Sequence, residues 1–290
     1  MREQYYEQVQ TIKQQGHFDS YFHLRYATEN PNTNKTYLPI YWHYVWWTIH
    51  GQKDKQLILD VRNAVENIYN GLDPTLRYFT VTCGVHCNEN LYPILPSNVE
   101  IYCGGYNDGE CDNLWHAIPY YKNQWPRRRD ELPKDIFCFY PMTGDYQGKV
   151  RDQLNKLLTC NEYKGFSHQI FSTCRIYSFD LYAELLNRSK FVLCPRGTNP
   201  GTFRFYEAME CGAIPVYISN QFILPYQDEV NWDDCCVRIT PDQMKNIPEI
   251  LSSISDDRQA RMRKAISSFV SQYLTYEKMY KNIIKHVGIK

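Results

Sequence analysis

The chain has 290 residues, 43% of them hydrophobic, and its 32 basic and 32 acidic side chains cancel to a formal net charge of zero. This length and apolar content suffice for two ordinary domains, each with its own core. The lack of net positive charge argues against a dedicated nucleic-acid-binding protein, whose surface is usually strongly basic. The basic run Arg127–Arg129 is followed at once by Asp130 and Glu131, so we interpret it as a solvated loop.

The N-terminal segment carries no targeting or membrane signal. Residues 1–15 are polar, and no apolar run approaches the roughly 20 residues that span a bilayer. We therefore expect a soluble, cytoplasmic chain without a membrane span. The alternative is that an N-terminal anchor has been removed.

The N-terminal half predicts an α/β domain over residues 1–133. Two of its strands end in polar loops, and loops of this kind commonly carry binding residues. The helix expected at 54–69 ends before Gly71 and separates these two strands from the strand expected at 37–42. The expected elements are a helix at 1–20, a strand at 37–42, a helix at 54–69, and strands at 78–82 and 99–102. Residues 117–133 are rich in proline and charge and are the best candidate linker.

The eleven cysteines favour buried thiols over a disulfide framework, because their number is odd and some, such as Cys138 and Cys194, lie within apolar strands. One cluster contains enough residues for a zinc site but lacks paired Cys-x-x-Cys spacing, so we predict no metal there. A Cys103–Cys111 disulfide is the alternative in an oxidising compartment. The cluster consists of Cys83, His86, Cys87, Cys103, Cys111 and His116.

The C-terminal half predicts a second α/β domain over residues 134–265. Its expected elements are strands at 136–140, 191–194, 214–218 and 236–239, strand and helix segments around 169–176 and 179–187, and a short helix within 241–255. Apolar residues from Ile266 to Val287 recur at steps of three and four, which predicts an amphipathic helix over 266–290. This helix is expected either to cross back to the first domain or to pack on its own.

Residues 191–218 have the pattern of a strand, a loop, a helix and a strand, which predicts a right-handed parallel crossover. Asn199 is a suitable N-cap with Pro200 in the first turn, and Gly212 ends the helix. A diphosphate at this strand end would meet Arg196, the free N–H groups of the helix start and the Thr202 hydroxyl. In the alternative interpretation Arg196 is solvated, and Arg204 and Glu207 form an exposed ion pair.

Several motifs in this half resemble the exostosin family, glycosyltransferase family 47. They are Cys-Pro-Arg-Gly at 194–197, Gly-Thr-Phe-Arg-Phe-x-Glu-Ala at 201–208, Gly-Ala-Ile-Pro-Val at 212–216, Leu-Pro-Tyr at 224–226 and Val-Asn-Trp at 230–232. Looser similarity lies at 137–139, Gly144 and 148–154, and at 37–42. The similarity covers roughly residues 36 to 235, with firm motifs only in the second half.

The resemblance implies a GT-B architecture, in which two Rossmann-like domains face each other across a cleft. It also implies inverting transfer from a UDP-sugar to a hydroxyl of a glycan acceptor. Many proteins of the family are Golgi enzymes with an N-terminal anchor, so the resemblance implies the Golgi lumen if an anchor has been removed. The alternative is a compact soluble member, a form carried by large algal viruses, and a pentose such as xylose is favoured only for such a member. The implied UDP-binding residues are Arg196, Gly197, Gly201, Thr202, Arg204, Glu207, Gly144 and Arg151.

An inverting transfer needs a general base and positive charge at the departing diphosphate. We nominate His86 and Asp108 as alternative bases. Trp42, His43 and Asp112 are further candidates on the acceptor side. No Asp-x-Asp triplet occurs, and fixed cations and helix dipoles can hold the leaving group, so we expect no metal or other cofactor.

Two other classes of protein remain to be weighed. A non-catalytic glycan-binding module on the same fold would bind sugars through its aromatic residues, but the four side chains Arg196, Thr202, Arg204 and Glu207 argue for a competent donor site. A sugar-nucleotide epimerase would need a Gly-x-Gly-x-x-Gly fingerprint, which the sequence lacks.

Overall fold

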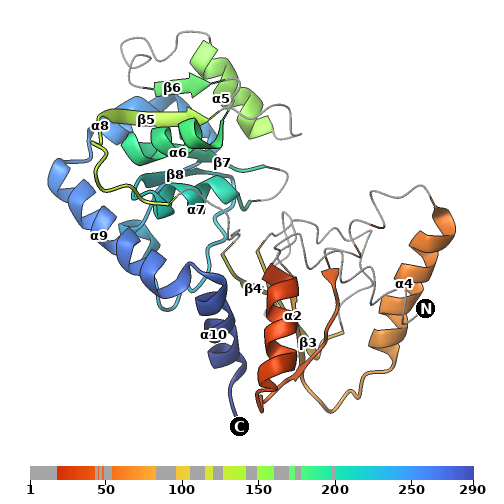
Figure 1. The fold of residues 1–290 in the computed structure, drawn as a ribbon. Helices are drawn as coiled ribbons and strands as arrows, with labels where there is room; N and C mark the ends of the chain where they lie inside the picture. The colour runs from red at the N-terminus through yellow and green to blue at the C-terminus, as the bar shows by residue number, and fades with distance from the viewer. Residues whose placement is uncertain are drawn as a thin grey trace. The chain divides into compact units, whose positions relative to one another are not determined.

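The computed structural model describes residues 18–42, 45, 48, 54–82, 96–104, 115–119, 127–141, 149–159, 170–173, 178–197 and 200–290. The chain divides into two compact units, residues 1–123 with 275–290 (unit 1) and residues 124–274 (unit 2). Each unit contains a parallel β-sheet with helices (Figure 1). This confirms the α/β class, with the two parallel-sheet units that the predicted GT-B architecture requires.

Unit 1 is built on a four-stranded sheet in the order β1-β2-β3-β4, with every neighbouring pair parallel. All five residues of β2 are buried, as is typical of a parallel strand that is covered on both faces. The strands are β1 (Thr36–Tyr37), β2 (Tyr78–Thr82), β3 (Val99–Cys103) and β4 (Trp115–Ala117), and the helices are α2 (Phe18–Glu29), α4 (Lys55–Asn70) and α10 (Tyr276–Val287).

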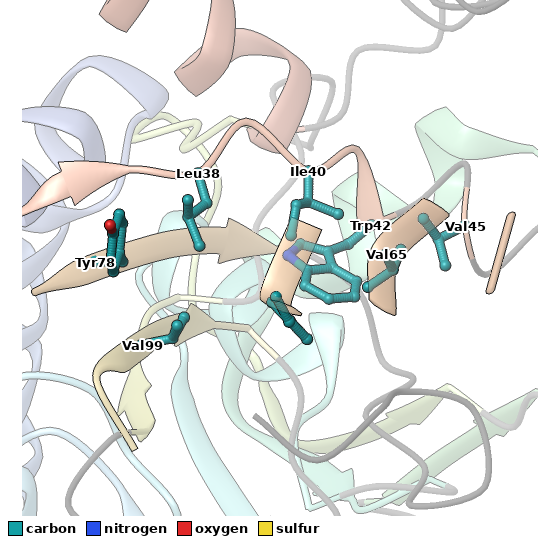
Figure 2. Packing of buried hydrophobic residues seen from close by; sticks show 8 residues of the cluster. Leu38, Ile40, Trp42, Val45, Val65, Tyr78 and Val99 are labelled. Carbon is teal, nitrogen blue, oxygen red and sulfur yellow. The ribbon is translucent and has the colours of Figure 1, made fainter. Parts of the chain in front are cut away.

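The predicted strand at 37–42 is wrong beyond Tyr37. The Leu38 N–H still bonds to the carbonyl of Phe79, but Ile40 donates to Leu38 and Trp42 donates to Ile40. The chain therefore satisfies its own backbone groups locally instead of extending the ladder. The segment from Leu38 to Trp42, which we call the strap, is irregular up to Tyr41 and helical at Trp42, and its apolar side chains pack in the core of unit 1 (Figure 2).

Trp42 lies in this core and is 2% exposed, so neither ring face is available for stacking on a sugar. Its indole Nε1 donates to Thr80 Oγ1 at 2.9 Å, and Thr80 Oγ1 donates to the carbonyl of Leu38 at 3.1 Å. These two bonds fasten the strap to the middle of β2. The structure thus gives Trp42 a packing role where the sequence indicated a role on the acceptor side.

Unit 2 carries a five-stranded parallel sheet in the order β6-β5-β7-β8-β9. The first strand, β5, has β6 on one side and β7 on the other, so the direction of winding reverses between β5 and β7. The strands are β5 (Ile136–Pro141), β6 (Ile170–Thr173), β7 (Ser189–Pro195), β8 (Ile214–Ile218) and β9 (Val237–Ile239). Ligands of such sheets bind at the reversal, outside the carboxyl ends of the strands.

The helices of unit 2 are α5 (Lys149–Thr159), α6 (Phe179–Arg188), α7 (Phe203–Glu210), α8 (Ile247–Ser252) and α9 (Asp256–Tyr273), with short 3₁₀ segments at Trp232–Asp234 and Pro241–Asn246. The single amphipathic helix predicted over 266–290 is wrong. Helix α9 ends at Tyr273, with Leu274 as its C-cap. The side chain of Thr275 then caps a new helix, α10, by accepting a hydrogen bond from the Lys278 N–H. No helix in the described ranges is long and apolar enough to cross a bilayer.

All six cysteines in the described ranges are buried, which agrees with the prediction of buried thiols. Burial raises the pKa of Cys138 and of Cys194, so neither is a reactive thiolate at neutral pH. Cys111 of the alternative disulfide lies outside the described residues. Of the six residues weighed as a zinc cluster, the structure describes Cys103 and His116.

Substitution Trp42→Phe is expected to lower the free energy of unfolding of unit 1 by about 1 to 3 kcal/mol, because it removes a buried hydrogen bond and ring volume. Denaturant titration measures the loss. In a Thr80→Val background the same change should cost less, since the bond is already absent. Equal losses in both backgrounds would show that the bond contributes nothing.

Candidate functional site

Arg196 follows the last residue of β7 at the point where the winding of the sheet reverses. Its main-chain N–H donates to the carbonyl of Ile218, the last residue of β8, at 2.8 Å. Its guanidinium donates from Nη1 to Oδ1 of Asn220. The side chain is 5% exposed, so the predicted cation is buried in a fixed position at the carboxyl edge of the sheet.

Arg151 reaches the same loop from α5. Its Nε donates to the main-chain carbonyl of Arg196 at 3.1 Å. Its Nη2 lies 3.3 Å from the position that a Cβ atom on Gly197 would occupy, which is closer than ordinary side-chain contacts. The absence of a side chain at 197 therefore lets the second guanidinium approach the loop. The structure brings together three of the predicted residues: Arg151, Arg196 and Gly197.

Helix α7 begins at Phe203, with Thr202 as its N-cap, and not at Asn199–Pro200 as predicted. The carbonyl of Pro200 accepts a hydrogen bond of 2.8 Å from the phenolic hydroxyl of Tyr217, so a tertiary contact holds Pro200 outside the helix. Thr202 is buried, and its hydroxyl makes no capping hydrogen bond to the helix. The predicted end of the helix is confirmed, since Gly212 adopts a φ of 65° just beyond it.

Glu207 and Arg204 lie one turn apart on α7, and the hydroxyl of Tyr182 on α6 donates to Oε2 of Glu207. Burial, followed by the negative charge of Glu207, raises the pKa of Tyr182 well above its usual value, while Arg204 acts in the opposite direction. Arg204 is buried, as is Arg196. The alternative of a solvated Arg196 and an exposed Arg204–Glu207 pair is therefore wrong.

Five predicted site residues lie outside the described residues. They are Gly144, His86, Asp108, His43 and Asp112. In the sequence, Gly144 lies between β5 and α5. The identity of the general base stays a prediction from sequence.

Two residues at the site were not predicted. Asn220 could have been found, because it is a polar residue just after the strand 214–218 and thus at the same sheet edge as Arg196. Tyr182 offered no such signal, since it is one of 25 tyrosines and its role depends on how α6 packs beside α7.

Residues 108–254, about half of the chain, match the family model described as the exostosin GT47 domain. The chain belongs to this family of glycosyltransferases. It is 37% identical over 93 residues to an exostosin-1 homolog of Caenorhabditis elegans, covering 32% of this chain and 24% of that protein. It is 31% identical over 137 residues to a probable glycosyltransferase of Arabidopsis thaliana, covering 47% and 28%. The chain thus matches only about a quarter of the length of these relatives.

Similarity to solved structures is lower. HepE of Anabaena, solved in complex with UDP and glucose, has a TM-score of 0.46 at 14% identity, over 80% of this chain and 76% of that one. The GtfA/B complex has a TM-score of 0.44 at 10% identity, over 80% of this chain and 55% of that one.

Substitution Tyr182→Phe is expected to lower the free energy of unfolding by about 1.5 to 3 kcal/mol, the usual contribution of a hydrogen bond to a charged group. Denaturant titration measures it. As a control, Glu184→Gln removes an exposed partner of Arg188 on the same helix and should change stability by less than about 1 kcal/mol. If both variants were equally stable, the Tyr182–Glu207 contact would not support the site.

Proposed function

We propose that the protein is an inverting glycosyltransferase that moves a sugar from a UDP-sugar to a hydroxyl of a glycan acceptor. The observation that carries this proposal is the meeting of Arg151, Arg196 and Gly197 at the strand ends where the sheet of unit 2 reverses its winding. Such an edge is where α/β sheets bind nucleotides. Membership in the exostosin GT47 family supports a nucleotide-sugar as the occupant.

The departing UDP carries a diphosphate whose negative charge grows as the glycosidic bond breaks. Arg196 and Arg151 supply two guanidinium groups, which bind phosphate oxygens through paired N–H donors. The first N–H groups of α7, beside Gly201 and Thr202, supply further donors and the positive end of the helix dipole. These groups are fixed before the substrate arrives, so they stabilise the transition state without reorganisation.

Glu207 is proposed to accept hydrogen bonds from the ribose hydroxyls. The Tyr182 hydroxyl donates to its Oε2, which fixes the orientation of the carboxylate. Arg204 is buried one turn away on α7. In this arrangement Glu207 and Arg204 position the nucleoside, and Arg196 and Arg151 hold its diphosphate.

The acceptor hydroxyl must lose a proton to a general base, for which His86 and Asp108 are the proposed alternatives. Two arginines already supply the positive charge that a metal ion provides in other transferases, so we propose that transfer requires no metal cofactor. Xylose stays the proposed sugar. Hydrolysis of a panel of UDP-sugars without acceptor would identify the donor.

Substitution Arg196→Ala is expected to reduce kcat/KM by about 10²- to 10³-fold, because it removes a donor to the charge that develops on the leaving group. Release of UDP from the preferred UDP-sugar measures the effect. Arg188→Ala is the matched control, since Arg188 pairs on the exposed side of α6 with Asp135 and Glu184. Unchanged turnover in Arg196→Ala would remove this arginine from the site.

Calorimetric titration is expected to detect binding of UDP but not of NAD. Arg151→Met should weaken UDP binding about tenfold or more, because one charge-assisted phosphate contact is lost. Glu207→Ala should also weaken UDP binding. A Glu207→Ala variant that melts earlier yet keeps its UDP affinity would restrict Glu207 to a structural role. Absence of UDP binding in the parent protein would favour a non-catalytic glycan-binding module.

A further inference from the structure

Three metal-ligating side chains of unit 1 converge on one face of its sheet. They are Glu100 on β3, His116 on β4 and His286 in the last turn of α10, and their ligand atoms all lie within 4.8 Å of one another. Two imidazoles and one carboxylate are a ligand set that suits zinc and related ions. We propose that Glu100, His116 and His286 form a binding site for a divalent transition-metal ion.

The parallel register of the sheet creates the first half of the site. Tyr102 on β3 is paired with His116 on β4, and their rings stack with centroids 4.8 Å apart. Glu100 precedes Tyr102 by two residues and so points to the same face of β3. His116 Nε2 lies 2.9 Å from Glu100 Oε2, which places two ligands side by side.

Helix α10 supplies the third ligand. The rings of His116 and His286 are 4.6 Å apart, and the hydroxyl of Tyr102 lies 2.6 Å from Nδ1 of His286. A histidine ligand usually bonds through one ring nitrogen while an outer partner holds the other. Tyr102, which is 2% exposed, is well placed as that outer partner of His286.

The site can be reached by an ion from solvent, because His286 is exposed and His116 is partly exposed. Lys35 Nζ lies 2.6 Å from Glu100 Oε2 and so competes with a metal ion for this oxygen. An ion would displace the lysine from this oxygen, and the carboxylate keeps a second oxygen to which the lysine can turn. Three protein ligands leave room for water in the fourth position.

A bound ion would join α10 to β3 and β4, two strands that lie far from it in sequence. Because the ion binds the folded arrangement of all three elements, it would stabilise unit 1 by mass action. The ligands belong to unit 1, whereas the residues proposed to bind the diphosphate belong to unit 2. The proposal therefore stands apart from the expectation that sugar transfer itself requires no metal.

The test uses the full chain without an affinity tag, stripped of metal by a chelator and titrated with Zn²⁺ by calorimetry and with Co²⁺ by visible absorption. We expect one high-affinity ion per chain, Co²⁺ bands typical of nitrogen and oxygen ligands, and a melting temperature that rises with Zn²⁺. His116→Ala and His286→Gln should each weaken binding at least tenfold and abolish the rise. Lys35→Met should strengthen binding, since it removes the competing cation.

His23→Gln is the matched control, because His23 lies on α2 beside Tyr41 and should bind as the parent does. If His116→Ala does not fold, the exposed His286→Gln decides the question. Absence of binding would overturn the proposal. Binding that survives both histidine substitutions, or that is lost instead on joint replacement of Cys83 and Cys87, would also overturn it.

Discussion

The proposed function depends on the hydrogen bond from Arg151 Nε to the main-chain carbonyl of Arg196. This bond ties α5 to the loop after β7 and brings two guanidinium groups to the same few ångströms of backbone. Guanidinium nitrogens are donors only, and phosphate oxygens accept such donors in pairs. This complementarity is why we propose a diphosphate at this loop. Because Arg196 is buried and hydrogen-bonded to Asn220, its position is fixed before any ligand binds.

The order of strands explains why these two arginines meet although 45 residues separate them. β5 and β7 are neighbours in the sheet, so the helix that follows β5 and the loop that follows β7 both start from the same edge. The register of the two buried strands fixes where each one ends along this edge, because Phe139 on β5 pairs with Val192 on β7 in a parallel ladder. Core packing therefore sets the positions of the two arginines. The loop itself needs only a small residue where Arg151 approaches it, and Gly197 meets this need.

Much of this could be predicted from sequence wherever a short apolar run lies between strong breakers. The sequence predicts strands 78–82 and 214–218 residue for residue, and the helix predicted at 54–69 ends before Gly71 as expected. The errors occur where a tertiary contact overrides local preference. Tyr217 holds Pro200 out of α7, and the Trp42–Thr80 bond helps hold 38–42 as a strap. Of the candidate site, Arg196 and Arg151 came from motifs, whereas Tyr182 depends on helix packing that no local pattern encodes.

The break at Leu274 is the least predictable feature of the chain and one with a large consequence. The apolar spacing continues through it, yet α9 groups with unit 2 and α10 with unit 1. Contacts within unit 1 explain why α10 stays there: Phe22 packs on Tyr280 with ring centroids 5.0 Å apart, and Arg25 pairs with Glu277. At the other end of the helix, Tyr102 holds His286. The aromatic contacts lie in the first turns of α10, and the last turns are held by the buried side chains of Ile283, Ile284 and Val287. An ion shared by Glu100, His116 and His286 would add a polar link to this apolar packing and so tie the end of the helix to β3 and β4.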